Sequence, residues 1–158
     1  MSFTFNEENE KKFQALLKRY PKKDSLTLPS LWMVQYQEGW INEDALVYIA
    51  QRLDKSPMDI YSIASFYTMF NLKQIGKYHF QMCKTLSCML NGSENILNHL
   101  ENRLGIKAGQ TTKDMKFTIS KVECLGACGG GPCMSLNDTY HENLTVQKID
   151  DLLEELEK

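Results

Sequence analysis

The residues of this chain best suited to chemistry are its five cysteines, four of which form two spaced pairs. Four residues separate Cys83 from Cys88. Three residues separate Cys124 from Cys128, and 35 residues lie between the two pairs. In a reducing compartment, cysteines in this number are more often metal ligands or catalytic thiols than disulfides, and an odd count fits a fully disulfide-bonded domain poorly. The spacing therefore predicts a metal site built from four thiolates.

Composition and charge indicate an ordinary globular protein. Of the 158 residues, 42% are hydrophobic and 24% are charged, close to globular averages. The net charge of −2 offers no basic surface for nucleic acid. The first residues contain acidic groups and lack an apolar stretch, so we expect no targeting segment there. No apolar run approaches the ~20 residues that span a bilayer. We therefore expect a cytoplasmic protein without nucleic acid partners or direct membrane insertion.

The first half of the chain reads as a helical bundle over residues 1–74. Apolar residues at helical spacing predict helices over residues 13–20, stopped by Pro21, and over residues 28–36, ended by Gly39. A third helix is expected after Asn42 and a fourth after Ser56, because both residues are good N-caps. Short connections favour antiparallel neighbours and hence a small bundle.

The second half, residues 75–158, reads as a small α/β domain of thioredoxin-like type. Alternating residues predict strands over 78–82 and 117–122, and helical spacing predicts helices from residue 93 to 104 and from residue 146 onward. A hairpin is expected over 134–144, with its turn at Asn137 and Asp138. The fold class is thus α+β or α/β, with the domain boundary at about residue 74.

The predicted elements bring the two cysteine pairs to one place. Cys83 follows the strand over 78–82, and Cys124 follows the strand over 117–122. A strand–helix–strand connection makes a parallel pairing reasonable, and parallel strands end at the same edge of a sheet. The four thiolates are therefore expected to converge on one site.

The residues around the pairs favour a cluster over a bare ion. Gly126 and the glycines over 129–131 allow positive φ and a close approach of backbone N–H groups to sulfur. An apolar shell that limits solvent access is expected from Leu86, Met89, Leu90 and Leu125.

Spacing alone leaves other kinds of site open. A four-cysteine zinc site uses the same ligands, although its pairs are usually tighter. A thioredoxin-type redox site needs the motif C-x-x-C, which is absent. Unrelated buried cysteines are the third reading. On the residues alone, an iron–sulfur cluster, a zinc-stabilised interaction module and buried or redox thiols all remain.

Two segments containing the four cysteines closely resemble the cluster-binding segments of a known family. They are residues 83–93 (CKTLSCMLNGS) and residues 124–132 (CLGACGGGP). Residues 60–70 (IYSIASFYTMF) resemble the family's Phe-Tyr helix, and residues 39–41 (GWI) its Gly-aromatic-aliphatic turn. The family is the small [2Fe–2S] subunit of the flavoprotein module of NADH–quinone oxidoreductase, respiratory complex I. Related subunits occur in NAD-linked hydrogenases and formate dehydrogenases.

The resemblance implies a helical bundle followed by a thioredoxin-like ferredoxin domain that binds one [2Fe–2S] cluster on Cys83, Cys88, Cys124 and Cys128. It implies a one-electron carrier that has no catalytic residues and no turnover alone. NADH and FMN are expected only on a larger partner subunit, in a complex peripheral to the inner face of the cell membrane. The equivalent subunit of an NAD-linked hydrogenase or formate dehydrogenase is the alternative, because the sequence does not separate these assemblies.

Two positions depart from the family's pattern. Asn42 stands where the family often has proline, which should alter only a helix start. Cys133 lies outside the four-ligand pattern, and we interpret it as a strand residue with a buried thiol rather than a fifth, exchangeable ligand.

Other residues invite functional readings that their context does not favour. Surface positions or hydrogen-bonded core positions are expected for His79, His99 and His141, because none has a partner at ligand spacing. Core positions in the bundle, rather than a cofactor-stacking role, are expected for Phe66, Tyr67 and Phe70.

Overall fold

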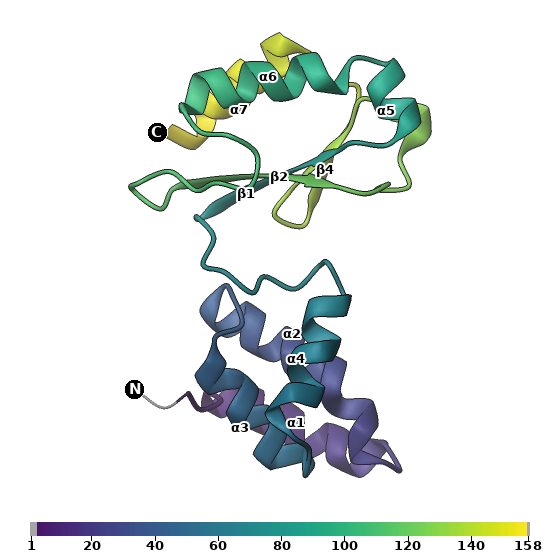
Figure 1. The fold of residues 1–158 in the computed structure, drawn as a ribbon, viewed down its shortest axis with the longest axis vertical. Helices are drawn as coiled ribbons and strands as arrows, with labels where there is room; N and C mark the ends of the chain where they lie inside the picture. Colours follow the sequence, from purple (N-terminus) through teal and green to yellow (C-terminus); the bar gives the residue numbers. More distant parts are fainter. Residues whose placement is uncertain (1–2, 158) are drawn as a thin grey trace. The chain divides into compact units, whose positions relative to one another are not determined.

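The computed structural model describes residues 3–157, which form two compact units. The first unit ends at Gln74 and the second begins at Ile75 (Figure 1). In the described part of the chain, no helix is long and apolar enough to cross a membrane.

The first unit consists of four α-helices and one short 3₁₀ helix. They are α1 (Glu7–Arg19), η1 (Lys23–Leu26), α2 (Thr27–Glu38), α3 (Glu43–Leu53) and α4 (Pro57–Phe66). The Asn42 side chain accepts a hydrogen bond from the Ala45 N–H, and Ser56 forms a capping box with Asp59, so both predicted caps are confirmed. Helix α2 ends at Gly39, whose φ of 80° lies in the left-handed region.

The bundle core confirms most of the helical pattern but corrects two aromatic residues. Phe70 is buried as expected, whereas Phe66 is 76% exposed and Tyr67 is 37% exposed. The reason is rotation along α4, where Ile60 and Ala64 face the core. Phe66 follows Ala64 by two residues, which is about 200° around a helix and therefore points outward. The expectation that Phe66 and Tyr67 are core residues was wrong.

The second unit is built on a four-stranded mixed sheet. Its strands are β1 (Tyr78–Cys83), β2 (Phe117–Val122), β3 (Met134–Leu136) and β4 (Thr139–His141), in the order β2-β1-β3-β4. β1 and β2 are parallel, as predicted, and their register runs from the pair Tyr78–Phe117 to the pair Cys83–Val122. β3 and β4 form the predicted hairpin, whose turn residue Asn137 has a φ of 52°. β3 also pairs with β1 in antiparallel orientation.

Three α-helices and one short 3₁₀ helix complete the described part of the second unit. They are α5 (Leu86–Leu90), α6 (Ser93–Leu104), η2 (Cys128–Gly130) and α7 (Val146–Glu157). Figure 1 shows α6 and α7 on the same face of the sheet. Leu100 of α6 and Ile149 of α7 are fully buried with Phe80 and Ile119 of the sheet in one apolar core. This core holds β1 and β2 in register, and with them the edge at which the cysteines lie.

Candidate metal centre

Two of the predicted ligands are positioned by the carboxyl ends of parallel strands. Cys83 is the last residue of β1, and Cys124 follows Val122, the last residue of β2, by two positions. Because Cys83 and Val122 are paired in the sheet, both chain segments leave it at the same edge. The predicted route from strand order to a common edge is therefore confirmed.

Cys88 lies on α5, a five-residue helix that the sequence pattern did not predict. A helix this short has too few positions to show helical periodicity. Cys83 and Cys88 are each 1% exposed. The side chain of Thr85 does not cap α5. Its hydroxyl lies instead 3.2 Å from the Cys83 sulfur.

Cys124 and Cys128 form a second pair, which is exposed. Their sulfur atoms are 3.9 Å apart. Gly126, with a φ of 78°, lets the loop turn so that its N–H donates to the Cys124 sulfur at 3.4 Å. Leu125 and Ala127 of this loop pack against the buried cysteines, so the loop lies over them.

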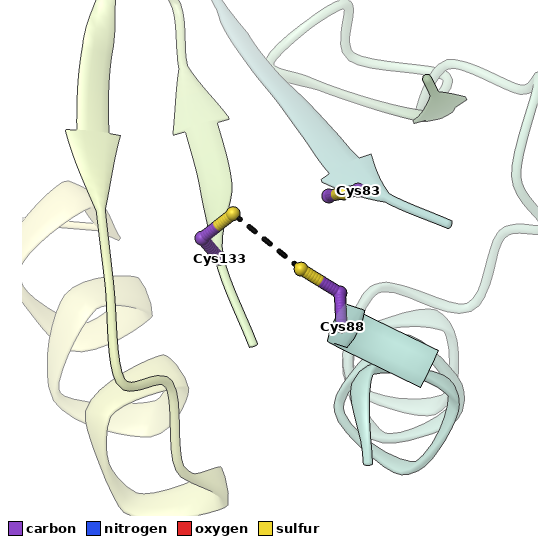
Figure 2. Close-up of side chains that lie close together, drawn as sticks. All are labelled: Cys83, Cys88 and Cys133. Atoms are coloured by element: carbon purple, nitrogen blue, oxygen red, sulfur yellow. Dashed lines mark hydrogen bonds between the residues drawn. The ribbon is translucent and has the colours of Figure 1, made fainter. Parts of the chain in front are cut away.

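The structure brings a fifth cysteine into contact with the first pair. The sulfur atoms of Cys83, Cys88 and Cys133 all lie within 4.8 Å of one another (Figure 2). Within residues 3–157, no other set of three or more histidine, cysteine or carboxylate side chains brings its ligand atoms this close together. Cys124 and Cys128 are not part of the trio. Cys133 has the buried thiol that was expected, but its proximity to Cys88 was not foreseen. It results from the antiparallel pairing of β3 with β1, which the sequence pattern did not predict.

The three buried thiols differ in proton affinity. Burial raises the pKa of Cys83, but hydrogen bonds from Thr85 and from the Leu125 amide outweigh it and lower the pKa to about 7. Burial raises the pKa of Cys88. Burial, together with the nearby sulfurs of Cys88 and Cys83, raises the pKa of Cys133 to about 12. Cys83 is therefore the buried thiol most ready to serve as a thiolate ligand.

The glycine-rich segment only partly matches its predicted role. Gly126 has the expected positive φ, but Gly129, Gly130 and Gly131 are not among the positive-φ residues. A side chain at Gly130 would collide with Glu142, so this glycine allows close packing against a carboxylate rather than against a metal. At Gly131 an added Cβ would lie 3.6 Å from the Cys88 sulfur. The absence of side chains here thus shapes the wall of the site.

The expectation of an apolar shell around the cysteines was wrong for Leu86, Met89 and Leu90, which are exposed. Leu86 is 65% exposed, Met89 49% and Leu90 76%. They lie on α5, which is too short to bury more than one face, and that face carries Cys88. Leu125 is the one predicted shell residue that packs against the buried cysteines.

His79 and His99 form hydrogen bonds with side chains other than the cysteines. His79 is buried and its Nε2 lies 2.8 Å from the Ser120 hydroxyl, while burial lowers its pKa to about 4. His99 pairs with Asp150 at 2.9 Å. These two are hydrogen-bonded residues, in line with the expectation for them.

The cysteine residues fit a metal–sulfur centre. Two thiolates bound about 2.3 Å from one tetrahedral metal lie about 3.8 Å apart. The 3.9 Å between the sulfurs of Cys124 and Cys128 matches that separation. The N–H of Gly126 and the hydroxyl of Thr85 both lie against sulfur, where hydrogen bonds offset the negative charge of thiolates. The donor set suits an iron–sulfur cluster.

Comparison with known proteins places these residues in context. Residues 13–157 match the model of the family described as thioredoxin-like [2Fe–2S] ferredoxin. A subunit of the NADH-quinone oxidoreductase of Rickettsia felis is 45% identical over 98% of this chain and 94% of its own length. A subunit of the same enzyme from Rhizobium meliloti is 45% identical over 89% of this chain and 84% of its own length.

A solved structure shares the fold at lower sequence similarity. The crystal structure of an NAD+-reducing [NiFe]-hydrogenase in the air-oxidized state matches 84% of this chain with a TM-score of 0.76 and 23% identity. The present chain spans only 23% of that hydrogenase chain. At this identity the match supports the two-unit fold and nothing more specific.

Proposed function

This chain belongs to the thioredoxin-like [2Fe–2S] ferredoxin family, and on that premise we propose that it is the one-electron carrier subunit of an NADH–quinone oxidoreductase. The observation that carries the proposal is the 45% identity, over 98% of this chain, to a protein named as a subunit of that enzyme. The cysteine-rich sheet edge is the part of the chain suited to the task.

We propose that the cluster is held by the two pairs recognised in the sequence, Cys83 with Cys88 and Cys124 with Cys128. The 3.9 Å separation in the second pair supports two sulfurs on one metal. The lowered pKa of Cys83 supports a thiolate in the first pair. The loop between Cys124 and Cys128 packs through Leu125 and Ala127 against the buried cysteines, and the Leu125 amide donates a hydrogen bond to the Cys83 sulfur, which supports a common site for the two pairs.

The chain's own residues hold and shield the cluster. When bound, a [2Fe–2S] cluster takes up and releases one electron at a time. The N–H of Gly126 and the hydroxyl of Thr85 donate to ligand sulfurs and lessen their charge. The burial of Cys83 and Cys88 keeps water from one side of the site. None of these roles involves proton transfer to a substrate, and we expect no turnover from the chain alone.

The open side of the site is where we propose that the electron-transfer partner binds. Cys124 and Cys128 are exposed, and Leu86 and Leu90 present apolar surface on the neighbouring helix α5. Exposed apolar residues of this kind are typical of surfaces that meet another protein. The proposed partner is the subunit that binds NADH and FMN, and the complex would hold this chain at the inner face of the cell membrane.

Metal analysis of the full chain purified without oxygen tests the cluster. We expect about two irons per chain, a red-brown colour and a rhombic EPR signal after reduction. Cys124→Ser and Cys128→Ser should each lose iron and visible absorbance, while Cys133→Ser is the matched control and should keep both. A colourless chain that contains zinc, or unchanged iron in the Cys124→Ser variant, would refute the assignment.

Co-expression tests the partner. With the flavin-binding subunit of an NADH–quinone oxidoreductase, NADH should reduce the cluster within one turnover, whereas the isolated chain should not react with NADH. If the chain co-purifies instead with hydrogenase or formate dehydrogenase subunits, the assembly is the alternative one and the electron-carrier role stays the same.

A further inference from the structure

We propose that the Cys133 thiol donates a hydrogen bond to the cluster ligand Cys88 and thereby raises the reduction potential of the cluster. This inference rests on the ligand assignment proposed above. It assigns a role to the one cysteine that the four-ligand pattern leaves unused.

The β-sheet fixes the position of Cys133. In the antiparallel pairing of β1 with β3, Met82 faces Met134, so the next pair along the strands is Cys83 with Cys133. The pairing continues there, since the Cys83 N–H donates to the Cys133 carbonyl at 3.2 Å. Directly opposed residues project to the same face of a sheet. Cys133 is therefore held beside the ligand Cys83 by the backbone itself.

The side chain of Cys133 points at the second buried ligand. Its sulfur lies 3.6 Å from the Cys88 sulfur (Figure 2), and Cys133 is 1% exposed. Leu125 and Ala127 pack against the same three cysteines, which leaves little access for water. A buried thiol needs an acceptor for its proton, and the sulfur of Cys88 is the acceptor that the structure offers.

The direction of this hydrogen bond follows from metal binding. In the metal-free chain either thiol can be the donor. Metal ligation requires the thiolate form of cysteine, so a ligated Cys88 has no proton to give. Cys133 is then the donor and the Cys88 sulfur the acceptor.

The expected consequence is on the electron equilibrium. Hydrogen bonds to ligand sulfurs are one of the means by which proteins set the potential of iron–sulfur clusters. An added electron makes the sulfur more negative, and a hydrogen bond to a more negative acceptor is stronger. The Cys133 thiol therefore stabilises the reduced cluster more than the oxidised one.

Infrared spectroscopy of the loaded full chain tests the bond directly. With four of the five cysteines bound to iron, Cys133 carries the single S–H group of the chain. We expect one S–H stretching band that disappears in Cys133→Ala and moves to lower frequency when the cluster is reduced. Absence of the band in the wild type, or a band that does not respond to reduction, would overturn the proposal.

Redox titration of the variants tests the effect on potential. Cys133→Ala should keep two irons and reduce the equilibrium constant for one-electron reduction several-fold, where tenfold corresponds to 59 mV. Cys133→Ser retains a donor and should recover part of the change. Met134→Leu, a conservative change at the adjacent buried position, should leave the potential unaltered.

The outcomes separate this inference from the proposed function. Equal potentials in wild type and Cys133→Ala would overturn the hydrogen-bond role while the cluster assignment stands. Loss of iron from Cys133→Ala would overturn the hydrogen-bond role and also the assignment of the ligands, because it would make Cys133 itself a ligand. A wild-type chain that binds no iron would overturn the proposed function and this inference with it. If Cys133→Ala does not fold, the response of the S–H band in the wild type decides the question.

Discussion

Replacing Gly76 by alanine should destabilise the second unit, because the strand edge opposite the cysteines has no room for a methyl group. Gly76 is buried just before β1, and an added Cβ would lie 2.8 Å from the Phe117 nitrogen. The Lys116 carbonyl carbon and oxygen would lie 2.9 and 3.0 Å away. All three atoms belong to the backbone, so no side chain can rotate to make space.

The magnitude follows from how far that backbone must move. Ordinary van der Waals contact begins at 3.4 Å, so the segment before β2 would have to shift by about 0.4 to 0.6 Å. The segment is held by hydrogen bonds of 2.8 Å from the Tyr78 N–H to the Lys116 carbonyl and 2.7 Å from the Gly76 N–H to the Thr118 hydroxyl. Forced overpacking of this kind costs roughly 1–3 kcal/mol. In a unit of this size, each kcal/mol lowers the melting temperature by about 4–8 °C.

Urea unfolding of the full chain measures this cost unit by unit. The two tryptophans, Trp32 and Trp40, both lie in the first unit, so their fluorescence reports that unit, while the visible absorbance of the cluster reports the second. Gly76→Ala should lower the midpoint for loss of absorbance and leave the fluorescence midpoint in place. Lys113→Ala is the matched control, because Lys113 is exposed in the same unit and precedes β2, at the end of that strand opposite the cysteines. Equal absorbance midpoints for the two variants would refute the reasoning.

Three further outcomes are expected in urea titrations. Burial lowers the pKa of His79 from 6.5 to about 4, so between these pH values the unfolded chain binds a proton at His79 that the folded chain does not bind. The free energy of unfolding should therefore fall by about 3 kcal/mol as the pH drops from 6.5 to 4. His79→Gln should remove this pH dependence. Hydrogen bonds from Arg52 and Gln14 lower the pKa of Glu10 to about 2. Their contribution to the free energy of unfolding is therefore present above pH 4.5 and is lost as the pH falls toward 2. Glu10→Gln should lower the free energy of unfolding by about 1 kcal/mol at pH 7 and by almost nothing at pH 2. Phe66→Ser should change stability by less than about 0.5 kcal/mol, because the ring is exposed.

Local interactions made much of this fold predictable. The starts of α3 and α4 are encoded by Asn42 and Ser56, whose side chains bond backbone groups three residues away. The parallel pairing of β1 and β2 follows from a strand–helix–strand order with a connection long enough to cross over. Each of these features depends on residues close in the sequence or on a general rule of chain topology.

Features that depend on distant residues escaped prediction. The exposure of Phe66 depends on which face of α4 the rest of the bundle covers, since both faces carry apolar residues. The helix that carries Cys88 is too short to show periodicity. The exposed positions of Leu86 and Leu90 follow from that helix and overturn the expected shell.

The cysteine site shows the same division. That two pairs of thiols follow two neighbouring strands could be predicted from the amino-acid order, because the spacing of cysteines relative to strand patterns is a local property. Which sulfurs touch depends on the assembled sheet. Cys88 and Cys133 are 45 residues apart and meet because β3 pairs with β1 in one particular register. A register is chosen by the packing of whole strand faces, and a slip of one residue would turn Cys133 to the opposite face of the sheet.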